Sequence, residues 1–203
     1  QPPPLRVPGI PHWGEVTVTR GELGSGAADY ALDRIPLPVD NPQRRNLRPS
    51  GIDFFPDGRA AVVTYDGDVW IVSGLDAGLG SVRWKRFVGG MHEPNSVRIR
   101  DGEEIFVCGR NGITQLIDRD GDGEADIYRN HCSDFWQSAE TRDFNHSMAI
   151  ARDGSFFITK GGQQNDLPSK HSGRALHISP DGKHVQVFAS GLRNAYLSIR
   201  PGT

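Results

Sequence analysis

Residues 50–60 read SGIDFFPDGRA, and two later stretches share their arrangement. Residues 94–102 read PNSVRIRDG, and residues 146–156 read HSMAIARDGSF. In each stretch an alternating apolar run leads into an Asp-Gly step, and another strand-like run follows. Glycine adopts positive φ without a steric penalty, so an Asp-Gly step between two such runs is typical of a tight hairpin turn. The three stretches therefore predict three equivalent β-hairpins.

The same order of elements continues beyond each hairpin. The Asp-Gly steps lie about 44 and 52 residues apart, and a Pro-Gly step follows after about 48 more. Two further strand-like runs come after each hairpin: residues 68–72 and 82–87, then 113–117 and 126–128, then 175–178 and 185–188. Four short strands in such a period are typical of a β-propeller blade. We predict an all-β chain with about three four-stranded blades; the alternative is a β-sandwich with accidental self-similarity.

The segment before the repeat has a different composition. Residues 1–48 are rich in proline, which favours extended conformations, and only residues 15–19 alternate like a strand. We expect an extended arm that lies across a neighbouring blade or chain. The partial propeller then occupies residues 49–203, with blades at about 49–90, 91–140 and 141–192 and the start of a fourth at 193–203.

Three blades cannot close a ring, and their two open edges would present unpaired N–H and C=O groups. Propellers typically contain at least four blades. We therefore expect half of a six-bladed ring, which another chain or a further polypeptide segment completes.

Composition excludes several classes of protein. The chain has 203 residues and a net charge of −2, so it has no basic excess to neutralise a nucleic-acid backbone, and we expect no nucleic-acid partner. No apolar run approaches the roughly 18–20 residues of a membrane-spanning helix, so no transmembrane segment is expected. The 25 glycines and 14 prolines, nearly a fifth of the chain, disfavour helix bundles and coiled coils.

The sharpest motif is DRDGDGEAD, residues 118–126. Aspartates occupy positions 1, 3, 5 and 9 of a calcium loop, and Gly123 at position 6 allows the sharp turn. The expected ligands are the carboxylates of Asp118, Asp120, Asp122 and Asp126 and the backbone carbonyl of Glu124. Arg129 stands where an EF-hand has its bidentate glutamate, so water or a distant carboxylate must complete the shell. We expect a structural calcium loop in a β-hairpin; the alternative is an acidic turn without a metal.

Several motifs together point to a known family. They are RPSGIDFFPDG at residues 48–58, DGDVW at 66–70, the acidic loop, SPDG at 179–182 and ASGLRN at 189–194. With these motifs the chain from about residue 45 resembles the soluble quinoprotein dehydrogenases, the glucose- and sorbosone-dehydrogenase-like six-bladed propellers. The likeness is greatest to large secreted bacterial members that are often fused to cytochrome c modules, and it covers about half of such a propeller.

The resemblance implies oxidation of a sugar or an alcohol with pyrroloquinoline quinone bound on the propeller axis. In that family the Arg-Asn pair after Gly-Leu contacts the quinone, so Arg193 and Asn194 are the candidate cofactor ligands. A planar guanidinium suits a cofactor with several carboxylates, because it binds each of them bidentately. The resemblance also implies a cytochrome c electron acceptor and a location in the periplasm or outside the cell. A calcium loop that binds weakly suits the same compartments, where calcium is abundant.

The family's general base is a histidine near the inner end of an innermost strand. His146 and His171 are the candidates, since a near-neutral pKa suits proton abstraction. Two features depart from the family pattern: Ala195 stands in place of a proline, and His146 lies about three residues nearer to the hairpin than the family's base. These departures favour the alternative of a non-catalytic, calcium-stabilised propeller that acts as a scaffold or accessory subunit in a larger extracytoplasmic complex.

The two cysteines allow a geometric expectation. Cys108 and Cys132 fall on predicted strands that flank a third strand, so they should lie about 9–10 Å apart. A disulfide needs Cα atoms within about 7 Å. A bridge therefore forms only if the chain after Tyr128 folds back.

Overall fold

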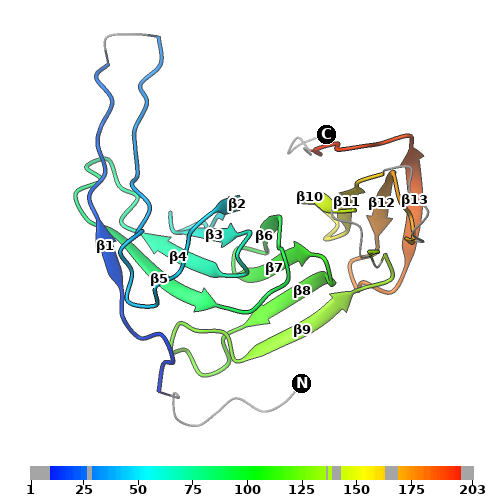
Figure 1. The fold of residues 1–203 in the computed structure, drawn as a ribbon, viewed down its shortest axis with the longest axis horizontal. Helices are drawn as coiled ribbons and strands as arrows, with labels where there is room; N and C mark the ends of the chain where they lie inside the picture. Colours follow the sequence, from blue (N-terminus) through cyan, green and yellow to red (C-terminus); the bar gives the residue numbers. More distant parts are fainter. Residues whose placement is uncertain (1–9, 27–28, 136, 139–142, 163–168, 198–203) are drawn as a thin grey trace.

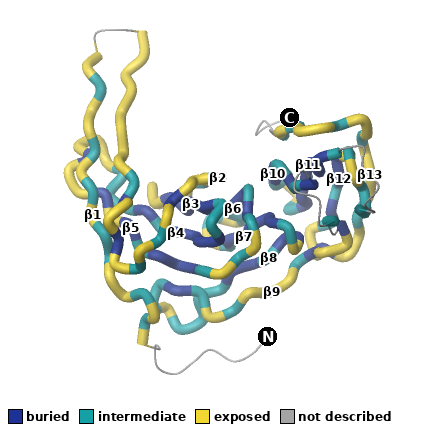
Figure 2. The backbone as a smooth tube through the Cα atoms, in the orientation of Figure 1, coloured by how far each residue is buried: buried dark blue, intermediate teal, exposed yellow. Residues whose placement is uncertain are grey.

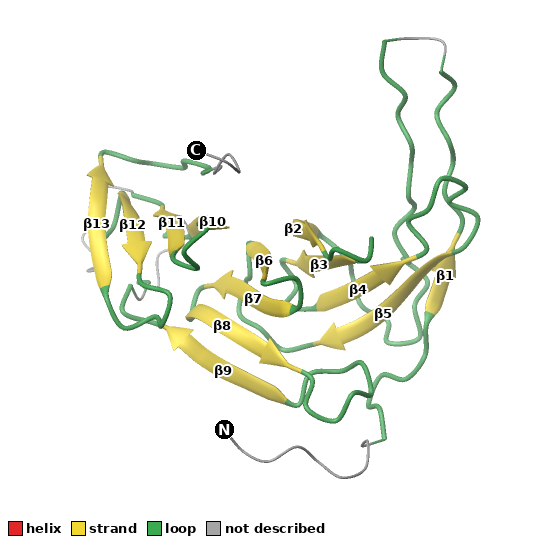
Figure 3. Ribbon diagram, turned by 180° about the vertical axis from the view of Figure 1, so that it is seen from behind, coloured by secondary structure: helices red, strands yellow, loops and turns green. Residues whose placement is uncertain are grey.

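The computed structural model describes residues 10–26, 29–135, 137–138, 143–162 and 169–197. These residues form thirteen strands and no helix, arranged as three antiparallel sheets (Figures 1 and 3). The chain is all-β, as predicted. In the described part of the chain no helix has the length and apolar character needed to cross a membrane.

Each sheet corresponds to one predicted blade. The first contains β2 (Pro49–Phe54), β3 (Ala60–Thr64), β4 (Val69–Ser73) and β5 (Val82–Val88). The second contains β6 (Ser96–Arg100), β7 (Glu104–Gly109), β8 (Gly112–Ile117) and β9 (Ile127–Cys132). The third contains β10 (Asn145–Ile150), β11 (Phe156–Lys160), β12 (Arg174–Ile178) and β13 (Val185–Ser190). Within each blade the strands pair in chain order, so every connection is a hairpin.

The predicted Asp-Gly steps form the turns of the first hairpin in each blade. Gly58, Gly102 and Gly154 all have φ between +81° and +86°, a region that other residues rarely adopt. The Gly58 amide closes its turn by donating to the Phe55 carbonyl at 3.0 Å. The periodic signal in the sequence is therefore a repeated local backbone geometry.

Neighbouring blades pack face to face through apolar residues. Between the first two blades the buried residues are Phe55, Ala61, Val63, Val69, Phe87, Val88, Val97, Ile105, Val107 and Leu116. Between the second and third they are Phe106, Cys108, Ile113, Cys132, Phe135, Met148, Phe156, Ile158, Leu176 and Ile178. The inner strand β6 contacts both β2 and β10, so the three inner strands face a common axis. The blades form an arc around that axis and not a closed ring (Figure 1).

The outward face of the first blade is largely buried. A third apolar cluster covers it with residues of the arm and of the loop after β4: Leu47, Ala60, Val62, Trp70, Val72, Leu79, Val82 and Trp84, with Leu37 and Leu75 partly buried beside them. Beside this cluster Phe54 is 58% exposed and lines a hollow of about 560 Å³ with Ile52. On the third blade β13 is mostly exposed (Figure 2), and Phe188, 54% exposed, packs edge-on against Phe157 with ring centroids 5.5 Å apart.

The N-terminal arm lies against the first blade, and its start also contacts Glu124 of the second blade. Strand β1 (Thr17–Thr19) pairs antiparallel with β5 and becomes a fifth, outer strand of that sheet. The Trp84 indole Nε1 fixes the register by donating to the Thr19 hydroxyl at 3.0 Å. Further along, Glu22 and Arg34 exchange backbone hydrogen bonds of 2.8 Å, and this part of the arm projects away from the blades (Figure 1).

Cys108 and Cys132 are free, buried thiols. Both oppose Ile113 of β8, one from each neighbouring strand, so an intervening strand separates them as the spacing argument predicted. Burial is the main cause that raises the pKa of Cys108 to about 12, and this thiol stays protonated and unreactive near neutral pH.

The interface between the second and third blades yields a stability prediction. Phe156 is fully buried and meets Phe106 edge-on at 4.9 Å. Phe156→Ala should lower the free energy of unfolding by about 3–5 kcal/mol, because it leaves a cavity between the sheets. Phe188→Ala is the matched control on an exposed face and should cost less than about 1 kcal/mol. Denaturant titration measures both; equal losses would contradict the assigned interface.

Candidate functional site

The three inner strands begin at one end of the molecule, which we call the axial mouth. In every blade the residue after the second strand donates its backbone N–H to a residue just before the inner strand. The pairs are Tyr65 to Arg48 (2.9 Å), Arg110 to His92 (3.0 Å) and Gly161 to Phe144 (2.7 Å). The side chains of the axial mouth considered below are Arg48, Tyr65, Glu93, Arg110, Phe144, His146, Asn194 and Tyr196. They come from all three blades and from the segment after the third.

His146 lies near the start of β10, the inner strand of the third blade. Its ring is 6.2 Å from the Phe144 ring and 5.8 Å from the Tyr196 ring, centroid to centroid. Its Nε2 is buried without a hydrogen-bond partner. Burial lowers the pKa of the imidazole below its ordinary value of 6.5, and a hydrogen bond to the Asn194 side chain acts in the opposite direction.

This arrangement defines what the imidazole can do chemically. The hydrogen bond to Asn194 favours the protonated ring, whereas burial favours the neutral ring and has the larger effect. The depressed pKa keeps the ring neutral at pH 7, so one of its nitrogens carries a free lone pair. The structure thus places a neutral imidazole next to Asn194, and these two of the four candidate residues come together.

The other two candidates are not among these contacts of His146: His171 lies in another loop, and Arg193 directly precedes Asn194 in the chain. His171 is in the loop between β11 and β12 with a left-handed φ of 62°. Burial and the nearby Lys170 lower the pKa of His171, and the further charges around it are Asp134, Lys160 and Arg174. The Arg193 carbonyl accepts the Gly162 N–H at 3.0 Å, and the residue is exposed.

A chain of charged and aromatic side chains continues from His146 across the mouth. Arg48 pairs with Asp66 at 2.6 Å and stacks over the Tyr65 ring at 5.1 Å. Burial, followed by a hydrogen bond to Glu93, raises the pKa of Tyr65, so its hydroxyl stays protonated. Glu93 in turn pairs with Arg110. The sequence analysis did not identify Tyr65, Glu93 or Arg110 as site residues. Tyr65 and Arg110 could have been found, because each directly follows the second strand of its blade.

Buried polar groups fix the start of β10. The Asn145 side chain donates to the Gly109 carbonyl of the second blade at 2.8 Å. Lys160, opposite Asn145 in the register, is fully buried; its ammonium donates to the Lys170 carbonyl at 2.6 Å and lies 3.5 Å from the Asp143 carboxylate. Burial lowers the pKa of Lys160, and Asp143 opposes this effect. These bonds hold the backbone next to His146.

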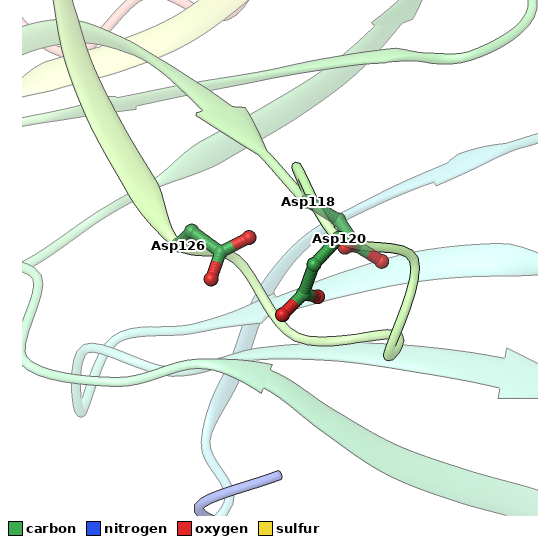
Figure 4. A group of neighbouring side chains, drawn as sticks. All are labelled: Asp118, Asp120 and Asp126. Atoms are coloured by element: carbon green, nitrogen blue, oxygen red, sulfur yellow. The ribbon is translucent and has the colours of Figure 1, made fainter. Parts of the chain in front are cut away.

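The acidic loop lies elsewhere, on the outer rim between β8 and β9. Carboxylate oxygens of Asp118, Asp120 and Asp126 lie within 4.8 Å of one another, and Figure 4 shows these side chains. Asp118 shapes the loop by accepting the backbone N–H groups of Gly121 at 2.7 Å and Gly123 at 2.8 Å. Clustered carboxylates repel one another, and oxygen ligands of this kind suit a hard cation such as calcium.

The two remaining acidic residues of the loop point to other partners. Asp122 accepts the Glu124 N–H at 2.8 Å, and its carbonyl accepts a hydrogen bond from the Lys85 ammonium of the first blade. The buried Glu124 carboxylate accepts the backbone N–H groups of His12 at 2.7 Å and Trp13 at 2.9 Å. Glu124 could therefore serve a metal through its carbonyl, as predicted, while its side chain holds the arm.

The arm is fixed at the same place by an ion-pair network. The Arg86 guanidinium lies 4.5 Å from the centre of the Trp13 ring and pairs with the buried Asp68 at 2.6 Å. Arg45, at the other end of the arm, pairs with the same carboxylate at 2.7 Å. The acidic loop thus joins the second blade to the first blade and to the arm.

Comparison with known proteins supports the fold. No family model and no curated protein matches the chain. A gluconolactonase structure from Xanthomonas campestris aligns with a TM-score of 0.52 and 16% identity, covering 72% of this chain and 48% of its own. A virginiamycin B lyase from Staphylococcus aureus aligns with a TM-score of 0.49 and 11% identity, covering 90% and 48%. The chain spans about half the length of these structures. The likeness to the gluconolactonase structure supports a β-propeller fold and nothing finer.

The contact between Glu124 and the arm yields a second prediction. Glu124→Gln removes the charge from a carboxylate that accepts two N–H groups, and charge-assisted bonds are about twice as strong as neutral ones. Hydrogen exchange at the His12 and Trp13 amides should accelerate about tenfold. Glu15→Gln, an exposed change two residues from Trp13, is the control and should leave both rates unchanged. Equal rates in the Glu124 variant and the parent protein would show that this carboxylate does not hold the arm.

Proposed function

We propose that the chain is part of a quinoprotein-dehydrogenase-like propeller that oxidises a sugar or an alcohol at the axial mouth, using pyrroloquinoline quinone. The observation that carries the proposal is the buried, unpartnered Nε2 of His146, whose ring is oriented by Asn194. A buried nitrogen without a partner is unfavourable unless a ligand uses it. The position of His146 on an innermost strand agrees with the role that the family resemblance implies.

Each residue has a separate task in this proposal. His146 removes the proton from the substrate hydroxyl, while the hydrogen bond to Asn194 stabilises the charged ring that results. Arg193 is exposed and directly precedes Asn194 in the chain. Its guanidinium is the candidate group for binding a carboxylate of the cofactor. The quinone, when bound, supplies the acceptor for the hydride that leaves the substrate carbon. The half-buried Phe144 ring shields the imidazole from water.

A second candidate function rests on the acidic loop. Asp118, Asp120 and Asp126 gather at a rim that also contacts the first blade and the arm. We propose that calcium binds this loop and strengthens those contacts, with water completing its shell. A propeller stabilised in this way can act as a scaffold or accessory subunit without any chemistry at the mouth.

The remaining proposals concern partners and location. Further blades, from another chain or a further segment of polypeptide, would cover the exposed apolar side chains of the terminal blades, which are Ile52 and Phe54 on the first and Val187 and Phe188 on the third. A cytochrome c is the proposed electron acceptor. We place the protein in the periplasm or outside the cell, where calcium is abundant enough for a weak site.

The dehydrogenase proposal has a direct test in the intact protein. His146→Gln should lower kcat/KM in a quinone-reconstituted, dye-coupled assay by about 10²- to 10⁴-fold, because a general base contributes that much. His177→Gln, which changes a ring stacked on Phe157 at 4.7 Å, should stay within about twofold of the parent protein. Activity should fall as the pH drops through a value below 6.5, since protonation of His146 removes the base. The lack of a quinone absorbance after reconstitution would overturn this proposal.

The calcium proposal is tested by thermal unfolding. Calcium should raise the Tm of the parent protein, and EDTA should reverse the change. The expected rise is about 2–4 °C for each kcal/mol that calcium binding adds to the free energy of unfolding. Asp120→Ala should abolish most of this response, because Asp120 supplies one of the three clustered carboxylates. Asp40→Ala removes an exposed carboxylate of the arm and should leave the response intact. An undiminished calcium response in the Asp120 variant would contradict the site.

A further inference from the structure

The imidazole of His146 lacks a hydrogen bond at Nε2, so its orientation depends on its other contacts. These are the hydrogen bond to the Asn194 side chain and the rings of Phe144 and Tyr196. Tyr196 is 79% exposed and therefore contributes little confinement. Phe144 is half-buried, and its backbone carbonyl is fixed by the Gly161 N–H at 2.7 Å. Among the described residues, the Phe144 ring is therefore the packing contact that most restricts the orientation of this imidazole.

Phe144 is itself held from the second blade. The Arg110 guanidinium lies 4.6 Å from the centre of the Phe144 ring, within cation–π distance. The Tyr65 ring meets Phe144 from the first blade, with centroids 6.1 Å apart and an edge-on geometry. The ring therefore sits among groups from three blades, of which Arg110 is the closest.

Arg110 is unusually well fixed for an arginine near the surface. Its side chain is only 10% exposed, it pairs with Glu93, and it donates to the Ser138 carbonyl at 3.1 Å. Glu93 reaches it from a left-handed backbone conformation with φ of 44°, which costs energy in a residue other than glycine. Strained conformations of this kind persist where the surrounding structure requires them, and here Glu93 also accepts from Tyr65.

We propose that Arg110 is a positioning residue: through Phe144 it holds the His146 imidazole in the orientation that the proposed proton transfer requires. Arg110 does not touch the reacting atoms. Its planar guanidinium stacks on Phe144, and Phe144 in turn limits rotation of the imidazole and keeps water from it. This inference rests on the proposed role of His146 as the base, and it adds a contribution from the second blade to a site on the third.

Arg110→Lys tests the inference in the intact protein, because lysine keeps the charge and loses the planar face. The readout is the NMR titration of the His146 ring, identified as the signal that is missing in His146→Gln. Greater access of water should move its pKa upward, toward its ordinary value, because burial is what lowers it. In the reconstituted enzyme kcat should fall about tenfold with little change in KM, as expected for a misplaced base.

Two further variants separate positioning from general stability. Arg100→Lys changes an arginine with the same environment, 4.4 Å from the Phe106 ring and paired with Glu104 at 2.7 Å, but away from the mouth. It should leave the His146 titration unaltered whatever it does to the Tm. Phe144→Leu should reproduce the shift, and its effect should not add to that of Arg110→Lys, because both break one contact chain.

The possible outcomes are distinct. An unaltered His146 titration in folded Arg110→Lys and Phe144→Leu proteins would overturn the positioning role. A shift of equal size in Arg100→Lys would also overturn it, since the effect would then be global. If His146→Gln keeps full dehydrogenase activity, the base assignment fails, while the titration still decides whether Arg110 positions the ring.

Discussion

Face-to-face packing of apolar sheet surfaces is the constraint on which the rest of this protein depends. The described residues form no helix that could cover a sheet, so each blade buries its faces against its neighbours. Phe106 and Phe156 meet across the second interface at 4.9 Å and show how closely the sheets approach. This stacking turns the blades around one axis and brings the starts of three inner strands together. The outward face of the first blade is buried in another way, under leucines of the arm and of the loop after β4.

The axial mouth follows from that stacking, and the repeat explains how it can carry chemistry. The backbone hydrogen bond after the second strand recurs in each blade, but the residue that donates it changes from Tyr65 to Arg110 to Gly161. The same backbone arrangement thus carries a different residue at the equivalent position of each blade. Contacts between those side chains then join one blade to the next, from the Tyr65–Glu93 bond through Arg110 and Phe144 to His146.

The acidic loop belongs to a different part of the molecule. It lies at the outer rim, where Glu124 binds the arm and the Asp122 carbonyl accepts from Lys85 of the first blade. A cation in this loop would act on the contacts between blades and arm, whereas any reaction at the mouth depends on His146 and its neighbours. A charge bound at the rim has little effect on the pKa of a distant base, because salt screens charges that lie far apart.

The sequence by itself determined the class of fold, because Asp-Gly turns and apolar alternation depend only on residues that are close together in the chain. It also marked the acidic loop, whose nine residues carry their own geometry, and the separation of Cys108 from Cys132 by a strand. It did not place strand β1 on the first blade, since the partner of a short polar strand is a long-range choice. Nor could it tell that Glu124 binds the arm, that Asn194 meets His146, or that Tyr65, Glu93 and Arg110 lie beside them. Those pairings join residues far apart in the chain, and only the stacking of the blades brings them within contact distance.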